Sequence, residues 1–303
     1  MKGIILAGGS GTRLYPITKG VSKQLLPVYD KPMIYYPLST LMQANIKDIL
    51  VITTKEDQMG FKRLLGDGKE FGINISYTIQ PSPNGLAEAF ILGEEFIGND
   101  ECAMVLGDNI YFGDGFEEYL LNAKENAENG IATIFGCQVP DPERFGIVEL
   151  GPNNKVLSVE EKPIFPKSNY AITGLYFYPK GVSKYAKEVK PSKRNELEIT
   201  SLNDIYLKKE ILKAEILGDG FTWFDAGLFD SLNDASNLIK SVEKNRGKVI
   251  SSPEAIAYEK GWITDEELQN SANIMKKNSY GEYLSKMLEK KKKAKTLSLT
   301  NRE

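Results

Sequence analysis

The stretch that decides the fold is KGIILAGGSGTR, residues 2–13, in which an apolar run ends in a glycine-rich turn. The run at 4–6 is typical of a buried β-strand. The glycines that follow it are Gly8, Gly9 and Gly11. Glycines let backbone N–H groups approach an anion closely, and Arg13 adds a fixed fork of donors. The stretch therefore predicts a strand followed by an anion-binding turn, with an ordinary strand-to-helix turn as the alternative.

Two common phosphate-binding patterns do not fit this turn. The Walker loop needs a glycine, four residues and then Gly-Lys-Ser or Gly-Lys-Thr, and no window of the chain supplies them. The dinucleotide fingerprint would start at Gly9 and needs a small residue where Leu14 stands. Neither nucleotide-binding class is indicated by the turn itself.

Composition narrows the class of protein. The 303 residues are 41% hydrophobic and 26% charged with a net charge of -3, so neither nucleic acid nor an anionic membrane is expected as a partner. No apolar stretch reaches the ~20 residues that cross a bilayer, and no signal peptide is expected. The two cysteines, Cys102 and Cys137, lie in apolar runs and are expected to be buried free thiols. These features favour a cytoplasmic protein.

The chain contains no histidine. Ser-His-Asp hydrolysis, histidine-ligated zinc and histidine acid-base catalysis are therefore excluded. An enzyme with this sequence must use carboxylates, lysine, arginine and backbone amides, with a hard metal ion as a further option.

Apolar runs and amphipathic segments alternate through the first half. Strands are expected at 4–6, 49–53, 75–79, 103–106 and 131–135, and helices at 33–44, 59–65, 86–96 and 116–127. Further strands are expected at 147–150, 156–159 and 172–178, and further helices at 198–209 and 232–243. The alternation predicts an α/β fold with a mainly parallel, mixed, Rossmann-like sheet covered by helices on both faces. Such sheets bind ligands at the carboxyl ends of their strands.

The pattern changes near residue 251, where it becomes helical and charged. We expect an α/β domain over 1–250 and a helical C-terminal extension over 251–303. The four lysines at 290–293 are expected to form a solvated helix end.

A second segment, SKQLLPVYDKPMIYYPLS (22–39), places Lys23 among apolar residues, where a cation needs an anionic partner. Together with GGSGTRLYPIT (8–18), it resembles the signature of the sugar-phosphate nucleotidyltransferases. Within that family the match is closest to the members that make dTDP-glucose from dTTP and glucose 1-phosphate. The resemblance covers nearly the whole chain and continues through LLGDG (64–68), QPSPNGLAEAF (80–90), VLGDNIYFGD (105–114), DPERFGIVE (141–149), EEKP (160–163), PKSNYAITGLYFY (166–178), ELEIT (196–200) and PEAIAYEKGWI (253–263).

The resemblance implies that the α/β domain over 1–250 is a nucleotidyltransferase domain with nucleotide- and sugar-binding halves. It further implies a nucleotide site. Its residues would be Gly8, Gly9, Gly11, Thr12, Arg13, Lys23, Gln24, Gln80 and Gly85. The glycines and Arg13 would hold the triphosphate, and Lys23 would neutralise it. The amide of Gln80 would read the edge of the base while Gly85 lets the ring lie on the backbone. Taken alone, the segment around Gly85 is equally typical of a turn.

The resemblance also implies a Mg²⁺ site at Asp108 and Asp225. Asp108 follows the predicted strand at 103–106 and so is expected at its carboxyl end. One or two carboxylates, completed by phosphate and water, are what this ion prefers. Taken alone, an aspartate after a strand is also typical of a turn or helix cap.

The sugar phosphate would be bound by a third group of residues, again by resemblance. They are Asn109, Phe145, Gly146, Glu161, Lys162, Ile172 and Trp223. Glu161 would accept hydrogen bonds from sugar hydroxyls and Lys162 would bind the phosphate; core packing is an alternative for Phe145 and Trp223. The implied catalytic residues are Arg13, Lys23, Asp108, Lys162 and Asp225.

The absent histidine fits the implied reaction. A sugar phosphate has a second pKa near 6 and is mostly dianionic at pH 7, so it attacks the α-phosphorus in line without a general base. Catalysis would come from charge stabilisation and positioning. We expect the carboxylates of the site to be ionised well below pH 6.

The chain departs from the family pattern beside one metal ligand. Ala226-Gly227-Leu228-Phe229 stands where the family usually has Thr-Gly-Thr-His, and Asp114 stands where a histidine is common. Two other functions stay open: a nucleotidyltransferase using UTP or another hexose 1-phosphate, and a non-catalytic regulatory module of the same fold. A homotetramer (a dimer of dimers), feedback by a downstream dTDP-sugar and a role in dTDP-rhamnose synthesis are further implications of the resemblance.

Overall fold

A mixed nine-stranded sheet forms the centre of the molecule in the computed structural model, which describes residues 1–9 and 11–300 and the side chains of these up to 293. The strands are β1 (Lys2–Ala7), β2 (Pro27–Val28), β3 (Lys31–Pro32), β4 (Asp48–Thr53), β5 (Asn74–Ile79), β6 (Cys102–Leu106), β7 (Asn109–Phe112), β8 (Ala132–Gln138), β9 (Gly146–Leu150), β10 (Val156–Glu161), β11 (Tyr170–Tyr178), β12 (Leu212–Leu217) and β13 (Thr222–Asp225). The helices are α1 (Tyr35–Gln43), α2 (Gln58–Leu65), α3 (Glu88–Leu92), α4 (Glu94–Ile97), α5 (Phe116–Glu128), α6 (Val182–Glu188), α7 (Ile199–Lys208), α8 (Phe229–Arg246), α9 (Pro253–Glu259), α10 (Asp265–Ile274) and α11 (Ser279–Thr300).

One half of the sheet is parallel, and the other is antiparallel except for the parallel pair of β8 and β12. Its main path runs β10-β9-β11-β6-β1-β4-β5, with β8 paired to β11 and β12 paired to β8. Strands β6, β1, β4 and β5 are parallel, whereas β11 runs antiparallel to its neighbours. The predicted α/β fold with a mixed sheet is confirmed.

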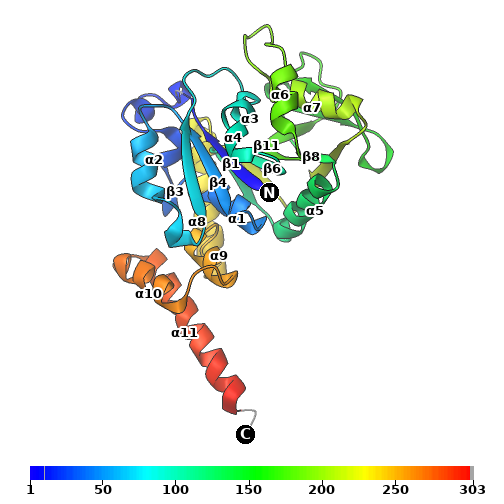
Figure 1. Ribbon diagram of the computed structural model, residues 1–303. Helices are drawn as coiled ribbons and strands as arrows, with labels where there is room; N and C mark the ends of the chain where they lie inside the picture. The colour runs from blue at the N-terminus through cyan, green and yellow to red at the C-terminus, as the bar shows by residue number, and fades with distance from the viewer. Residues whose placement is uncertain (10, 301–303) are drawn as a thin grey trace.

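Both faces of the sheet are buried, and neighbouring residues of one strand pack in different cores. Ile5 packs with α1, α5 and the C-terminal helices, while Ile4 packs on the other face with α3, α6 and α7. Successive side chains of a strand point to opposite faces, so burial of both faces explains why the apolar run in β1 is continuous. Figure 1 shows α6 and α7 lying apart from α1 and α2, and α9 to α11 below the sheet.

The predicted elements differ from the structure in a few places. The helix expected at 86–96 is two short helices, α3 and α4, which meet at Gly93, where the chain packs closely against Ile4 and Leu50. Strands β7, β12 and β13 and helix α6 were not predicted. Cys102 is buried, but Cys137 is only half-buried near the end of β8, which corrects the expectation for that thiol. Neither cysteine is in a disulfide.

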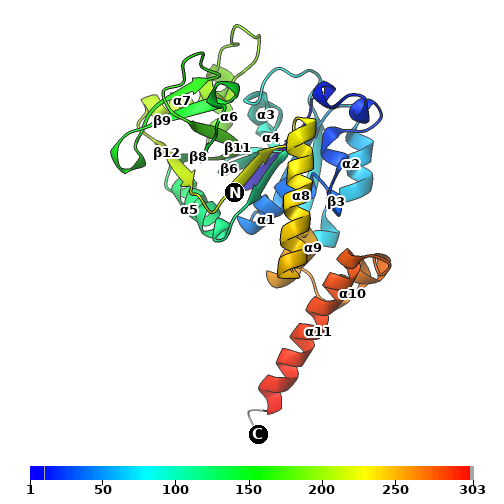
Figure 2. The same ribbon diagram turned by 180° about the vertical axis from the view of Figure 1, so that it is seen from behind.

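The C-terminal helices share a core with the sheet. Ala255, Leu268 and Leu284 pack in the same apolar cluster as Ile5 and Val51. Figures 1 and 2 show α11 extending away from the rest of the molecule. Lys290–Lys293 are exposed on it, as expected, but they do not form its end, because α11 continues to Thr300. No described helix is long and apolar enough to cross a membrane. The division of the chain at residue 250 stays a prediction.

The packing of the C-terminal segment can be tested at Gly72. This residue has φ 63 and ψ 28, and a Cβ there would lie 2.6 Å from the carbonyl oxygen of Trp262, between α9 and α10. We predict that Gly72→Ala lowers the free energy of unfolding by about 3 kcal/mol, because backbone strain and a steric clash add.

Gly247 provides the matched control. It has nearly the same conformation, φ 60 and ψ 27, with nothing near the position of a Cβ. Gly247→Ala should cost only the ~1 kcal/mol of the left-handed conformation. Equal losses in urea unfolding of the two variants would contradict the packing of Trp262 against Gly72.

Candidate active site

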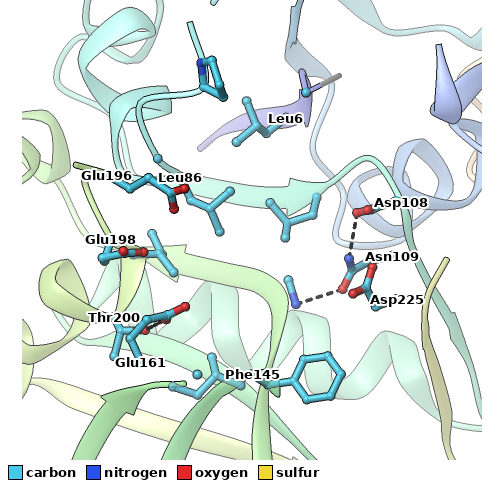
Figure 3. Close-up of a pocket in the computed structure, with 18 of the residues that line it drawn as sticks. Leu6, Leu86, Asp108, Asn109, Phe145, Glu161, Glu196, Glu198, Thr200 and Asp225 are labelled. Atoms are coloured by element: carbon cyan, nitrogen blue, oxygen red, sulfur yellow. Dashed lines mark hydrogen bonds between the residues drawn. The ribbon is translucent and has the colours of Figure 1, made fainter. Parts of the chain in front are cut away.

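A cavity of about 350 Å³ opens at the carboxyl ends of β1, β5 and β6, on the side where the parallel strands predict a ligand. Strands β9, β10, β11 and β13 and the segment 194–200 complete its walls. Figure 3 shows Asp108, Asn109 and Asp225 together at one side of it and Glu161, Glu196, Glu198 and Thr200 at another.

The cavity brings together most of the predicted site residues. Those that line it are Gly8, Gly9, Arg13, Lys23, Gln24, Gln80, Gly85, Asp108, Asn109, Phe145, Gly146, Glu161, Lys162, Ile172, Trp223 and Asp225. Gly11 and Thr12 are not among its lining residues. The carbonyl of Gly11 instead accepts a hydrogen bond from Thr18 Oγ1 (2.7 Å), and the side chain of Thr12 is exposed.

Asp108 lies between β6 and β7 with 13% of its side chain exposed. Burial opposes its ionisation, but the ion pair with the Lys23 ammonium holds the pKa of Asp108 below its ordinary value. Asn109 Nδ2 donates a further hydrogen bond to Asp108 Oδ1 (3.1 Å). Lys23 thus has the anionic partner that its apolar sequence neighbours demand.

Asp225 ends β13, which pairs antiparallel with β7 so that Asp225 lies opposite Asn109. The N–H of Ala226 donates to the carbonyl of Asp108 (3.0 Å), which brings the two aspartates side by side. Burial and the neighbouring Asp108 charge raise the pKa of Asp225 to about 6, although Lys23 and Arg13 oppose this. The expectation that every site carboxylate ionises well below pH 6 is therefore wrong for Asp225 in the metal-free protein.

The pair of carboxylates fits a hard divalent cation. Within the described residues there is no group of three or more His, Cys, Asp or Glu that could hold a metal by itself. Mg²⁺ needs only one or two protein carboxylates when phosphate and water supply the other ligands. A cation between Asp108 and Asp225 would also relieve the repulsion that raises the pKa of Asp225.

Arg13 approaches this end of the cavity over Gly227. A Cβ at Gly227 would lie 2.8 Å from Arg13 Nη2 and 3.1 Å from Asp225 Oδ1. The glycine that the sequence keeps from the family pattern therefore makes room for the guanidinium beside the aspartate.

The opposite wall joins β5 to the segment before α7. Gln80 is buried at the end of β5, and Gly85 has φ 109 and lies against the backbone of Leu197. The N–H of Leu197 donates to the carbonyl of Asn84 (2.6 Å), and the N–H of Ala87 donates to the carbonyl of Leu197 (3.0 Å). The two loops that frame this wall are thus held together by backbone hydrogen bonds.

The far half of the cavity holds Glu161, Lys162 and an aromatic pair. Glu161 Oε2 accepts a hydrogen bond from Thr200 Oγ1 (2.5 Å). The backbone of Lys162 is left-handed with φ 44, and its N–H donates to the carbonyl of Phe145 (3.0 Å). The rings of Phe145 and Trp223 meet edge to face at 5.2 Å, and both line the cavity.

Sequence reasoning missed several lining residues. They include Arg144, Tyr176, Arg194, Glu196, Glu198 and Thr200. Arg194 Nη2 contacts Glu161 (3.1 Å) and Glu198 (2.9 Å) and so joins the end of β10 to the start of α7, which are far apart in the sequence. Except for Arg194, these missed residues lie in segments that carry the family resemblance, at 141–149, 166–178 and 196–200, but the resemblance did not indicate their roles.

The sequence and the fold both match known proteins. The family model for nucleotidyl transferases matches residues 2–242. The chain therefore belongs to the nucleotidyl transferase family.

Relatives within this family place the chain more closely. It is 58% identical to a glucose-1-phosphate thymidylyltransferase of Neisseria meningitidis serogroup A and 52% identical to one of Mycobacterium tuberculosis, each match covering 96% of this chain and 100% of the relative. The resemblance inferred from the motifs is confirmed.

Solved structures agree with the fold. A Bacillus anthracis protein named as a glucose-1-phosphate thymidylyltransferase, in complex with sucrose, has a TM-score of 0.73 and 45% identity, covering 78% of this chain and 94% of that one. A UDP-glucose pyrophosphorylase complexed with UDP-glucose has a TM-score of 0.70 at 24% identity, covering 79% and 98%, and supports the fold alone.

The strained pair of carboxylates predicts a stability effect. Because the pKa of Asp225 is raised in the folded state, its contribution to stability is present below pH 4 and is lost as the pH rises through about 6. In EDTA at pH 8, Asp225→Asn should therefore raise the free energy of unfolding by about 1–2 kcal/mol. The gain should disappear near pH 4, where Asp225 of the folded wild-type protein is neutral, as the asparagine of the variant is. Urea unfolding that shows no stabilisation at pH 8 would contradict the assigned repulsion.

Proposed function

We propose that this chain catalyses a Mg²⁺-dependent transfer that makes dTDP-glucose and pyrophosphate from dTTP and glucose 1-phosphate. The observation that carries the proposal is the cavity itself, in which the paired aspartates and two cations lie at one side and a hydroxyl-accepting glutamate lies at the other. Relatives that match along nearly the whole chain bear the name of this reaction.

The nucleotide would occupy the half of the cavity formed by the turn after β1 and the loop after β5. Gly8, Gly9 and Arg13 would face the phosphates, and Gln24 lies beside them with its Oε1 held by the hydroxyl of Ser22 (2.8 Å). Lys23 would exchange its partner Asp108 for phosphate oxygens when the nucleotide binds. Gln80 and Gly85 would contact the base. Gly11 and Thr12 keep only a supporting role in this scheme.

The sugar phosphate would occupy the half formed by β9, β10 and β11. Glu161 would accept hydrogen bonds from sugar hydroxyls, while Gly146 and Ile172 leave room for the ring. Lys162 would bind the phosphate. Asn109 also lines the cavity and stays a proposed contact of the sugar phosphate, and its amide bonds to Gly174, Trp223 and Asp108. We assign it a positioning role as well.

The chemistry follows from charge rather than from a general base. An oxygen of the sugar phosphate forms a bond to the α-phosphorus of dTTP, the bond from that phosphorus to the bridging oxygen breaks, and pyrophosphate leaves with the electron pair. The attacking oxygen carries no proton at pH 7, so none has to be removed. Arg13, Lys23 and Lys162 would offset the repulsion between the two anions.

Asp108 and Asp225 would hold the divalent ion, which we take to be Mg²⁺. When bound, the ion supplies positive charge for the phosphates that these residues face. The two aspartates, ionised and held in register by β7 and β13, fix where that charge stands.

The alternatives drawn from the sequence are less well supported. The relatives at high identity are named for thymidylyl transfer, and the UDP-glucose enzyme is similar in fold only. A non-catalytic module would not need the cations and carboxylates that line the cavity. From the family resemblance we further propose a cytoplasmic homotetramer, a dimer of dimers, that is inhibited by a downstream dTDP-sugar and serves dTDP-rhamnose synthesis.

One incubation tests the central proposal. Purified protein, glucose 1-phosphate and Mg²⁺ are mixed with dTTP or with UTP, and pyrophosphate is measured. Release that is faster with dTTP supports the proposal. Release with UTP alone, or with neither nucleotide, would overturn it.

Arg13 provides a test of the phosphate contact. We predict that Arg13→Ala lowers kcat/KM for dTTP by about 100-fold, the usual loss for one group that stabilises transition-state charge. The melting temperature should stay within a few degrees, because the side chain is exposed and packs against no core. Arg63→Ala, an exposed arginine on α2 outside the cavity, is the control and should leave both quantities unchanged.

The pH dependence tests the mechanism without a base. The acidic limb of kcat/KM in saturating Mg²⁺ should follow the second pKa of the sugar phosphate, so a fluorinated analogue with a more acidic phosphate should move the limb to lower pH. Asp225 is the alternative candidate for control of the acidic limb, because its pKa is raised to about 6 in the metal-free protein. A limb that does not move with the analogue would assign control to that carboxyl.

A further inference from the structure

Glu88 stands directly behind the residue assigned to the base. It is the first residue of α3 and is half-buried, and it does not line the cavity. Its Oε2 accepts a hydrogen bond from Gln80 Nε2 (2.8 Å), and its Oε1 accepts one from Asn84 Nδ2 (2.8 Å). One carboxylate therefore connects the end of β5 to the loop that follows it.

The carboxylate decides which way round the Gln80 amide lies. An ionised carboxylate only accepts hydrogen bonds, so the nitrogen of Gln80 must face Glu88 and the oxygen must face away. The hydrogen bond is charge-assisted and therefore stronger than one between neutral groups. A second acceptor, the carbonyl of Gly85, lies 3.4 Å from the same nitrogen and favours the same orientation.

The oxygen of Gln80 faces the glycine turn. A Cβ at Gly8 would lie 2.8 Å from Gln80 Oε1, and both residues line the cavity. None of the hydrogen bonds found among the described residues uses this oxygen, whereas the nitrogen has two acceptors. The group that Gln80 presents to a ligand is thus an acceptor.

We propose that Glu88 is a positioning residue that selects the base by holding Gln80 with its oxygen toward the cavity. The inference rests on the proposed nucleotide site and deepens it. A pyrimidine with a hydrogen on N3, such as thymine or uracil, donates to that oxygen. Cytosine presents a bare N3 lone pair, which repels it and leaves both acceptors unmatched. The site would therefore take the diketo pyrimidines and reject cytosine.

The test compares bases in the full-length protein. Glu88→Gln keeps the size of the side chain but offers both a donor and an acceptor, so the Gln80 amide can lie either way round. The ratio of kcat/KM for dTTP to that for dCTP, with glucose 1-phosphate and Mg²⁺, should fall at least tenfold. Glu88→Lys can only donate, so it should turn the amide over and lower the ratio further. Glu95→Gln on α4, an exposed carboxylate remote from Gln80, is the control and should leave the ratio unchanged.

A purely structural role for Glu88 would not give this result. Loss of folded protein lowers both kcat/KM values equally and cancels in their ratio. A ratio for Glu88→Gln within twofold of the wild type would overturn the inference even if its stability fell.

Binding separates this inference from the proposed reaction. The dissociation constants of dTDP and dCDP, measured by calorimetry without sugar phosphate, should show the same loss of preference in Glu88→Gln. Wild-type protein that prefers dTDP but releases no pyrophosphate from dTTP would contradict the proposed function and leave the inference standing. Turnover of dTTP by the wild type, with an unchanged base preference in Glu88→Gln, would support the proposed function and contradict the inference about Glu88.

Discussion

Two carboxylates held side by side impose the constraint on which this structure depends. Asp108 and Asp225 come from segments more than a hundred residues apart, and the pairing of β7 with β13 leaves them no freedom to separate. Burial disfavours the charged form of Asp225 and the neighbouring Asp108 charge repels it, which is why the pKa of Asp225 rises. The Lys23 ion pair offsets part of that cost, and the cores on both faces of the sheet supply the stability that the site lacks. The two carboxylates that we propose hold a cation are thereby brought together at the expense of local stability.

Asn109 connects the paired aspartates to the other half of the cavity through hydrogen bonds. It is almost fully buried, and its Oδ1 accepts hydrogen bonds from the N–H of Gly174 (3.0 Å) and from Trp223 Nε1 (2.6 Å), while its Nδ2 donates to Asp108. One amide therefore fixes the middle of β11, the aromatic wall and an aspartate with respect to each other. Trp223 and Asp225 are two residues apart on β13, so their side chains lie on the same face of the strand, and both line the cavity. The two halves of the site share a rigid support rather than meeting across a flexible loop.

Hydrophobic patterns along the sequence predicted the buried strands of the central sheet. The apolar runs gave β1, β4, β5 and β6 within a few residues of their observed ends, because strands buried on both faces have to be apolar throughout. The position of Asp108 after β6 followed from the same run. The patterns failed for β7 and β13, which are four residues long and pair only with each other, and for the break at Gly93, which depends on packing against Ile4. The family resemblance supplied roles that periodicity could not.

The sequence by itself determined the fold class, the glycine turn, the absence of histidine chemistry and the set of charged residues from which a site could be made. Each of these is written in neighbouring residues or in composition. Only the tertiary structure decided that Gly11 and Thr12 lie outside the cavity, that Arg194 joins Glu161 and Glu198, and that Glu88 stands behind Gln80. The physical reason is that hydrogen bonds and ion pairs act over about 3 Å, whereas their partners can be separated by any length of chain. Their choice of partner depends on how the whole sheet and its loops pack.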